Sequence, residues 1–173
     1  RQMCIRDSID MGHNDTLTDL SFIGYMPELE ILILSGCAAS DLSGFENCKK
    51  LEYLELANCL KLSDLSPLAG CASLKYLNIC YTKVSSLMPL DGLPIQNLFC
   101  KQTRVAADEQ KQFKEIHPDA TAVFTGRDPY AGAGWRYTDN GYHYTEFYKK
   151  VREVFNLDQV DKLLRAQPVS YTH

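Results

Sequence analysis

The sequence predicts an α/β solenoid, in which a stack of short repeats builds one sheet and one apolar core. Three observations support this prediction. The apolar pattern L-x-x-L-x-L-x-x-C/T occurs four times, with starts 22, 23 and 21 residues apart. A shortened copy precedes these four, and the second half of each repeat carries its own motif in the same phase. The four full copies begin at Leu29, Leu51, Leu74 and Ile95, and the shortened copy consists of Ile9, Met11 and Asn14.

The first half of each repeat is predicted to be a short strand. Its L-x-L centre alternates with period two, which fits a strand that buries one face. A single repeat is too small to bury its own apolar face, so neighbouring repeats must cover it by stacking. We therefore assign the apolar positions to the core and not to a ligand site. After the four starting residues they are Leu32, Leu34, Cys37, Leu54, Leu56, Cys59, Leu77, Ile79, Thr82, Leu98, Cys100 and Thr103.

The second half of each repeat is predicted to return as turns and short extended or 3₁₀ pieces. It contains Pro, Gly and Ser and lacks a helical period. Its motif is Asp-Leu-Ser at residues 19–21, 41–43 and 64–66, with Ser-Leu-Met at 86–88 as a degenerate copy. Pro67 and Pro89 share one position, and Leu17, Leu62 and Val84 share another. Several equivalent positions, compared from repeat to repeat, therefore show the same period.

These residues resemble the leucine-rich-repeat family, closest to its 22-residue, internalin-like bacterial type with a D-L-S-P-L turn. The resemblance covers about residues 9–124. It implies a right-handed horseshoe with a parallel sheet on the concave side. The chain departs from the family pattern where Cys or Thr replaces the usual Asn, and only Asn14 keeps the family residue.

The pattern changes after the repeats, which we place at residues 9–105. Residues 106–116 are predicted to form a helix with Phe113 and Ile116 on one face, ended by His117-Pro118-Asp119. A last strand at 121–124 completes a C-terminal cap, residues 106–125. Residues 126–134 (GRDPYAGAG) have the composition of a linker. Residues 135–167 form an aromatic, partly helical tail, with a helix expected at 145–155 and an extension or second short helix at 157–164.

The two ends of the chain look foreign to it. Residues 1–8 and 168–173 resemble translated sequencing-adaptor sequence of the kind found in metagenomic chains. Extending the repeat backwards places Arg6 in the column of Leu29, Leu51 and Leu74, where burial of a charge is costly. We therefore interpret 1–8 and 168–173 as non-native segments and expect the natural chain to continue upstream with another repeat.

Residues between the leucines are expected to face outward on the concave sheet. Neighbouring parallel strands lie about 4.8 Å apart, so Tyr53 and Tyr76 should be adjacent. Tyr, Phe and Asn on a rigid sheet are typical of a binding surface. The alternative is that these residues only satisfy the side-chain preferences of a strand. The predicted binding residues are Ile31, Ile33, Tyr53, Glu55, Tyr76, Asn78, Tyr81, Asn97, Phe99 and Lys101.

The seven cysteines are interpreted as small buried side chains and weak hydrogen-bond donors. No C-x-x-C spacing suggests a metal site. In-register cysteines on neighbouring repeats should lie near the repeat spacing, whereas a disulfide needs a Cβ–Cβ distance of about 3.8 Å. Buried thiols are compatible with a cytosol or an anaerobic exterior. They do not fix the compartment, and the family resemblance favours an extracellular or bacterial cell-surface location.

Composition and motifs argue against several functions. The net charge is −4, no Lys/Arg cluster appears in the sequence, and no apolar run approaches the roughly 20 residues of a membrane span. We therefore expect neither nucleic-acid binding nor a membrane span. The four histidines and the carboxylates form no catalytic motif, so we expect no enzyme activity, cofactor or metal.

The sequence thus predicts a module that binds a protein partner through its concave face. Two alternatives stay open. The repeats could be the targeting arm of a bacterial effector enzyme whose catalytic domain lies outside this chain. Residues 135–148 could instead bind carbohydrate through their aromatic rings, although those rings could equally cover the end of the solenoid.

Overall fold

The computed structural model describes residues 8–126, 137–138, 143–144 and 146–158. Most of the segments predicted to be non-native, most of the linker, Trp135 and most of the 157–164 helix lie outside the described residues. The chain divides into two compact units, Arg1–Gly132 and Ala133–His173. Each unit is described by itself.

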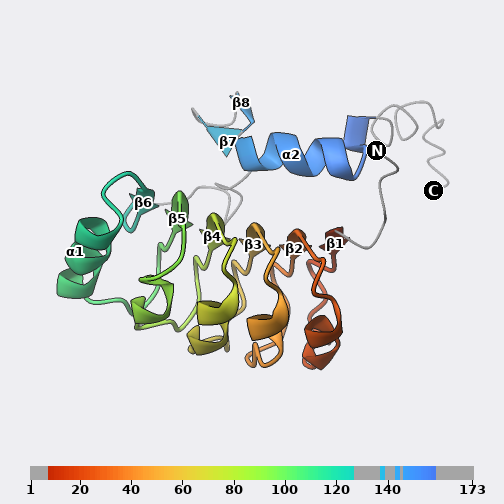
Figure 1. The fold of residues 1–173 in the computed structure, drawn as a ribbon, viewed down its shortest axis with the longest axis horizontal. Helices are drawn as coiled ribbons and strands as arrows, with labels where there is room; N and C mark the ends of the chain where they lie inside the picture. Colours follow the sequence, from red (N-terminus) through yellow and green to blue (C-terminus); the bar gives the residue numbers. More distant parts are fainter. Residues whose placement is uncertain (1–7, 127–136, 139–142, 145, 159–173) are drawn as a thin grey trace, which may run out of the picture. The chain divides into compact units, whose positions relative to one another are not determined.

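The first unit is a solenoid built on a six-stranded parallel sheet (Figure 1). Its strands pair in chain order, so each repeat lies beside the next one in the sequence. Leu32, Leu54, Leu77 and Leu98 align across four neighbouring strands, which confirms the predicted repeat and its phase. The strands are β1 (Ser8–Asp10), β2 (Ile31–Ile33), β3 (Tyr53–Glu55), β4 (Tyr76–Asn78), β5 (Asn97–Phe99) and β6 (Thr121–Val123).

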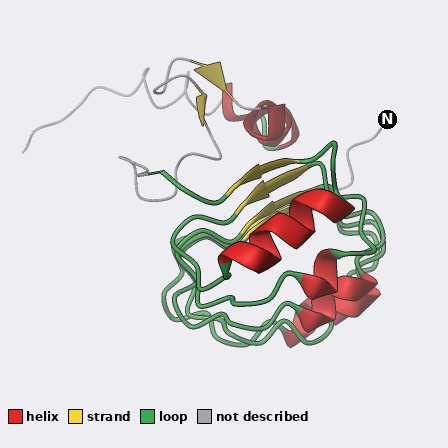
Figure 2. Ribbon diagram, turned by 90° about the vertical axis from the view of Figure 1, so that its left-hand side faces the viewer, coloured by secondary structure: helices red, strands yellow, loops and turns green. Residues whose placement is uncertain are grey.

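Each repeat returns through a short 3₁₀ helix on the side opposite the sheet (Figure 2). The Asp-Leu-Ser motif leads into these helices: the N–H groups of Ser21, Ser43 and Ser66 each donate to the Asp two residues earlier, at 2.8 Å. This explains why the motif repeats, because in each case the Asp side chain accepts from a backbone N–H at or just before the start of the helix. The helices are η2 (Ser21–Tyr25), η3 (Phe45–Asn47), η4 (Ser66–Gly70) and η5 (Met88–Leu90).

The core lies between the sheet and the 3₁₀ helices. The leucines of the repeat pattern are almost completely buried there, as predicted. Phe45 and Phe113 are the two bulkiest fully buried side chains. A Leu or Phe of this kind contributes roughly 1.5–3 kcal/mol by leaving water, so the stacked columns are the main source of stability.

The cap is helix α1 (Ala107–Ile116) followed by β6. Phe113 is buried under the end of the solenoid and contacts Phe124 edge-on at 6.3 Å between ring centroids. Ile116 was expected on the same face, but 40% of it is exposed. The helix ends at Ile116, and the ring of His117 packs on Phe113 instead, at 4.5 Å.

The cap also completes the degenerate fourth copy of the Asp-Leu-Ser motif. That copy has Ser86 in place of Asp, and the Ser86 hydroxyl oxygen accepts from the Met88 N–H at 3.3 Å, the bond that Asp makes in the other repeats. Glu109 Oε1 accepts from the Ser86 hydroxyl at 2.7 Å and from the Leu87 N–H at 2.5 Å. The cap thus adds two bonds to this repeat, one to the Ser86 hydroxyl and one to the Leu87 N–H.

The second unit contains an antiparallel pair, β7 (Tyr137–Thr138) with β8 (His143–Tyr144), and helix α2 (Glu146–Val154). Tyr144 and Tyr148 meet edge-on at 5.1 Å, and the guanidinium of Arg152 lies over both rings. The expected helix at 145–155 is thus present with nearly the predicted bounds. Among the described residues, no helix is long and apolar enough to cross a bilayer.

Candidate binding surface

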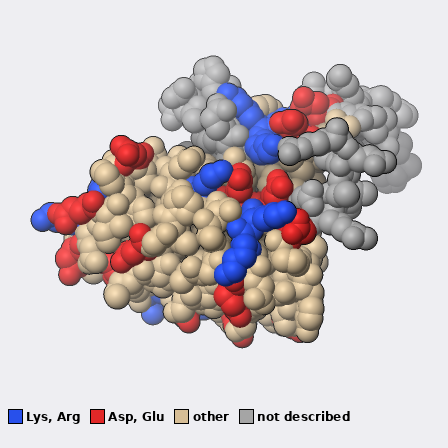
Figure 3. Space-filling model, viewed as in Figure 1, with Lys and Arg blue, Asp and Glu red and all other residues tan. Residues whose placement is uncertain are grey.

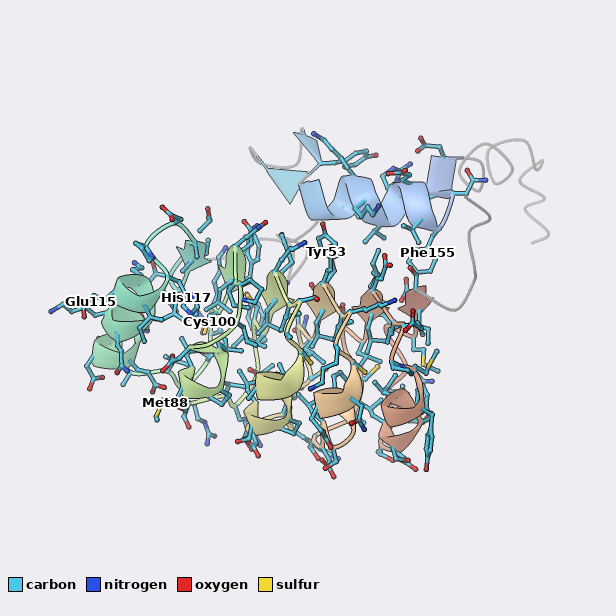
Figure 4. The ribbon with its side chains drawn as sticks, viewed as in Figure 1. Tyr53, Met88, Cys100, Glu115, His117 and Phe155 are labelled. Atoms are coloured by element: carbon cyan, nitrogen blue, oxygen red, sulfur yellow. The ribbon has the colours of Figure 1, made fainter. Side chains whose placement is uncertain are left out.

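The sheet positions eight of the predicted binding residues in two columns. Ile31, Tyr53, Tyr76 and Asn97 are register partners on successive strands, and so are Ile33, Glu55, Asn78 and Phe99. Alternation along each strand puts these side chains opposite the buried leucines. Figure 4 shows Tyr53 projecting from the sheet, on the other side of the repeats from Met88 of η5.

An aromatic cluster links three adjacent strands of this face. The ring centroids of Tyr53 and Tyr76 are 6.1 Å apart, which confirms that they are neighbours. Phe99, from the other column of β5, joins them at 5.5 Å from Tyr76. Both separations lie in the range of favourable ring pairs, so the cluster holds its rings in fixed positions.

Solvent access divides the ten predicted residues into two groups. In the chain as a whole, Tyr53, Tyr81, Asn97, Phe99 and Lys101 are half-buried. The accessible part of the predicted surface therefore runs from β3 to the residues that follow β5. The other five were expected to face solvent but are buried, with 5% or less of their surface exposed: Ile31, Ile33, Glu55, Tyr76 and Asn78.

Two of the buried residues are held by bonds to their own strand. Glu55 Oε1 accepts from the Ala57 N–H at 2.8 Å, and Asn78 Oδ1 accepts from the Cys80 N–H at 3.0 Å. Asp10 makes the same bond to Gly12 at 3.0 Å. The sequence contained a signal for this role, because these three acceptor side chains share one column. We interpreted that column only as a binding surface.

The chain then turns through a left-handed residue after each of the strands β1 to β5. These residues have φ between 55° and 72°, a region that costs most side chains about 1–2 kcal/mol. Gly and Asn tolerate it, but three of the five positions carry other residues, so the sequence did not reveal the turn. Tyr81 owes its orientation to this backbone. The five residues are His13, Gly36, Asn58, Tyr81 and Gln102.

Two columns of thiols bond from one repeat to the previous one. Cys59 Sγ donates to the Leu34 carbonyl at 3.2 Å, and Cys71 Sγ donates to the Phe45 carbonyl at 3.2 Å. Cys37 and Cys48 make the equivalent bonds one repeat earlier. The described cysteines are buried free thiols. The predicted role as weak donors holds for these four, whereas Cys80 Sγ accepts from the Lys101 N–H at 3.3 Å.

Burial makes these thiols poor nucleophiles. It raises the pKa of Cys59 and of Cys71 to about 12, so both stay protonated at neutral pH. Among the described residues, no group of three or more His, Cys, Asp or Glu side chains is placed to hold a metal ion. The half-buried side chains of the predicted surface offer aromatic rings, one amide and one ammonium group.

Comparison with known proteins identifies the repeats. The family model described as the endo-beta-N-acetylglucosaminidase EndoS LRR domain matches residues 24–117, more than half of the chain. The chain belongs to this leucine-rich-repeat family. No curated protein matches its sequence.

Two solved structures share the fold. An internalin (inlF) from Listeria monocytogenes has 25% identity and a TM-score of 0.56, over 67% of this chain and 35% of that one. A leucine-rich-repeat protein of Leptospira interrogans has 14% identity and a TM-score of 0.53, over 68% of this chain and 37% of that one. The chain thus spans about a third of the length of these two structures. Leucine-rich-repeat domains generally serve as protein-interaction modules, typically without catalysis.

Proposed function

We propose that the chain binds a protein partner through the accessible part of its concave face, without chemical turnover. The observation that supports this most directly is the aromatic cluster of Tyr53, Tyr76 and Phe99, which spans three strands of a rigid sheet. Aromatic side chains dominate the energetics of protein interfaces because they bury much area and lose little conformational entropy.

The residues around the cluster suit the rim of such an interface. Asn97 and Lys101 are half-buried and polar, and they lie next to Phe99 at the C-terminal end of the repeats. A partner segment could therefore bury aromatic surface at the centre and keep hydrogen bonds at the edge. The two matched structures come from bacteria, which supports a bacterial origin for this chain.

A displayed peptide library selected on the wild-type chain tests this proposal. The double variant Tyr53→Ala/Phe99→Ala should lose at least tenfold in affinity for most selected peptides. Tyr25→Ala is the matched control, because Tyr25 is 87% exposed on η2, on the other side of the repeats. Circular dichroism and thermal unfolding check that both variants keep the fold. Equal binding of the selected peptides by the two variants would contradict the assignment to the concave face.

A second candidate function is a non-catalytic arm of a larger enzyme. The matching family model is named for a domain of an endo-beta-N-acetylglucosaminidase, so repeats of this family occur as part of a glycosidase. In that case the concave face would position the enzyme on its substrate or partner. The uninterrupted gene decides this: a glycosidase domain in the same reading frame supports the arm, and a frame with repeats alone argues against it.

A further inference from the structure

The fold gathers three basic residues that are far apart in the sequence. Lys61, Lys83 and Arg104 are separated by 22 and 21 residues, and each follows a strand of its own repeat. The Lys83 N–H donates to the Leu62 carbonyl at 2.7 Å, and the Arg104 N–H donates to the Val84 carbonyl at 2.8 Å. These bonds place the Lys83 backbone against that of Leu62 and the Arg104 backbone against that of Val84. The three basic residues therefore lie on successive repeats, offset from one another by one or two residues along the chain. With about 4.8 Å per gap between repeats, the backbones of the three residues are spread over about 10 Å along the stack.

The three side chains are exposed, and none forms an ion pair with any residue in the described part of the chain. The opposite ends of the strands differ. There Lys50 pairs with Glu28, and Lys75 pairs with Glu52 at 2.9 Å. Like charges on adjacent repeats repel each other, so an anion bound across all three would relieve repulsion and gain attraction at once.

The surroundings add an apolar contact point. Leu60, next to Lys61, is 63% exposed, which is unusual for a Leu in this chain. We propose that Lys61, Lys83 and Arg104, the cationic column, bind a short acidic segment of a protein partner that lies extended across the repeats. Carboxylates of the segment pair with the three cations, and an apolar residue of the segment packs on Leu60.

The charge distribution favours a short polypeptide over a long polyanion. Residues 9–60 contain nine acidic and two basic residues, whereas residues 61–125 contain six acidic and seven basic ones. The column continues toward the N-terminus with the uncharged Ala38 and Thr16, and Asp15 lies beside Thr16. A nucleic acid or sulfated polymer that extended beyond the three cations would meet this acidic half and be repelled. A segment of a few acidic residues would not.

Fluorescence anisotropy with a labelled peptide tests the proposal. The probe is a Glu-rich peptide with one central Leu, and its control is the same peptide with Gln for Glu. The triple variant Lys61→Gln/Lys83→Gln/Arg104→Gln is compared with Lys49→Gln/Lys50→Gln/Lys75→Gln, which removes the same charge from the opposite ends of the strands. We expect a loss of at least tenfold for the first triple variant, less than twofold for the second, and weak binding of the Gln peptide.

Two further arms make the outcome decisive. A labelled single-stranded oligonucleotide should bind the wild-type chain more weakly than the acidic peptide. Tyr25→Ala, on η2, should leave peptide binding unchanged. Equal losses in the two triple variants would overturn the proposal, because they would show a general charge effect. Absence of acidic-peptide binding to the wild-type chain, or preferred binding of the oligonucleotide, would overturn it as well. Thermal unfolding verifies that both triple variants are folded.

Discussion

The residues before each strand and those after it hold neighbouring repeats in place through different kinds of contact. Before the strands, at the leading end, exposed charges of opposite sign bridge neighbouring repeats, as in Lys75–Glu52. Figure 3 shows a face of the molecule on which basic and acidic side chains lie next to one another in this manner. From the last residue of each strand onward, at the trailing end, side chains such as Glu55 and Cys59 are buried and bond to backbone groups.

The difference separates residues that stabilise the stack from residues that are available to bind a partner. Exposed ion pairs contribute little to stability because water and salt screen them, whereas buried hydrogen bonds are costly to lose. The leading end neutralises its own cations between repeats. The trailing end is fixed from within, so its exposed cations Lys61, Lys83 and Arg104 are not needed to hold the repeats together.

The largest expected effect is at alkaline pH and tests the buried thiols, most of which lie at the trailing end. Burial raises the pKa of Cys59, Cys71 and Cys80 to about 12 and that of Cys100 to about 11, from 9.0. Between pH 9 and these values the unfolded chain loses thiol protons that the folded chain keeps. The free energy of unfolding should therefore be highest below pH 9 and fall above it, by about 1.4 kcal/mol per pH unit per thiol.

Urea unfolding at a series of pH values measures this slope. Cys59→Ala should reduce the alkaline slope of the unfolding free energy by the contribution of one thiol, although it also lowers stability at neutral pH. Glu28→Gln, at the leading end, serves as the control that leaves the slope alone. A Cys59→Ala variant with the alkaline slope of the wild-type chain would show that this thiol titrates normally in the folded state.

An intermediate effect is expected for the strand-end bond of Glu55. Glu55→Ala leaves the buried N–H of Ala57 without its acceptor, which should cost about 1–3 kcal/mol in urea unfolding. Glu55→Gln keeps an acceptor oxygen in place and should cost less. If Glu55→Ala were as stable as the wild-type chain, this buried hydrogen bond would contribute no more to the free energy of unfolding than an exposed ion pair of the leading end.

The smallest effect is expected for the leading-end ion pair. Lys75→Met keeps most of the side chain but removes the charge that pairs with Glu52, and the pair is about one-third exposed. The expected loss is below about 1 kcal/mol and should shrink further in high salt. A loss equal to that of Glu55→Ala, unchanged by salt, would remove the contrast between the two ends.

The sequence was sufficient for the repeat, its phase and its core. The leucine columns, the cap helix, the last strand and the adjacency of Tyr53 and Tyr76 follow from a period that only stacking can satisfy. Residues with a backbone role were harder to identify. Tyr81 gives no local sign of a left-handed turn, and Glu109 bonds to Ser86 and to the Leu87 N–H from a helix more than 20 residues away.

The sequence by itself determined the apolar period. Each repeat contains its own leucines, and their apolar side chains must leave water wherever they lie in the fold. What the tertiary structure decided was which polar and charged side chains meet. It brought together Lys61, Lys83 and Arg104, which look isolated along the chain, and it turned Glu55 and Asn78 toward their own backbone. The physical reason is that burial is a property of residue type, whereas charge pairing and hydrogen bonding depend on distances that exist only after the repeats have stacked.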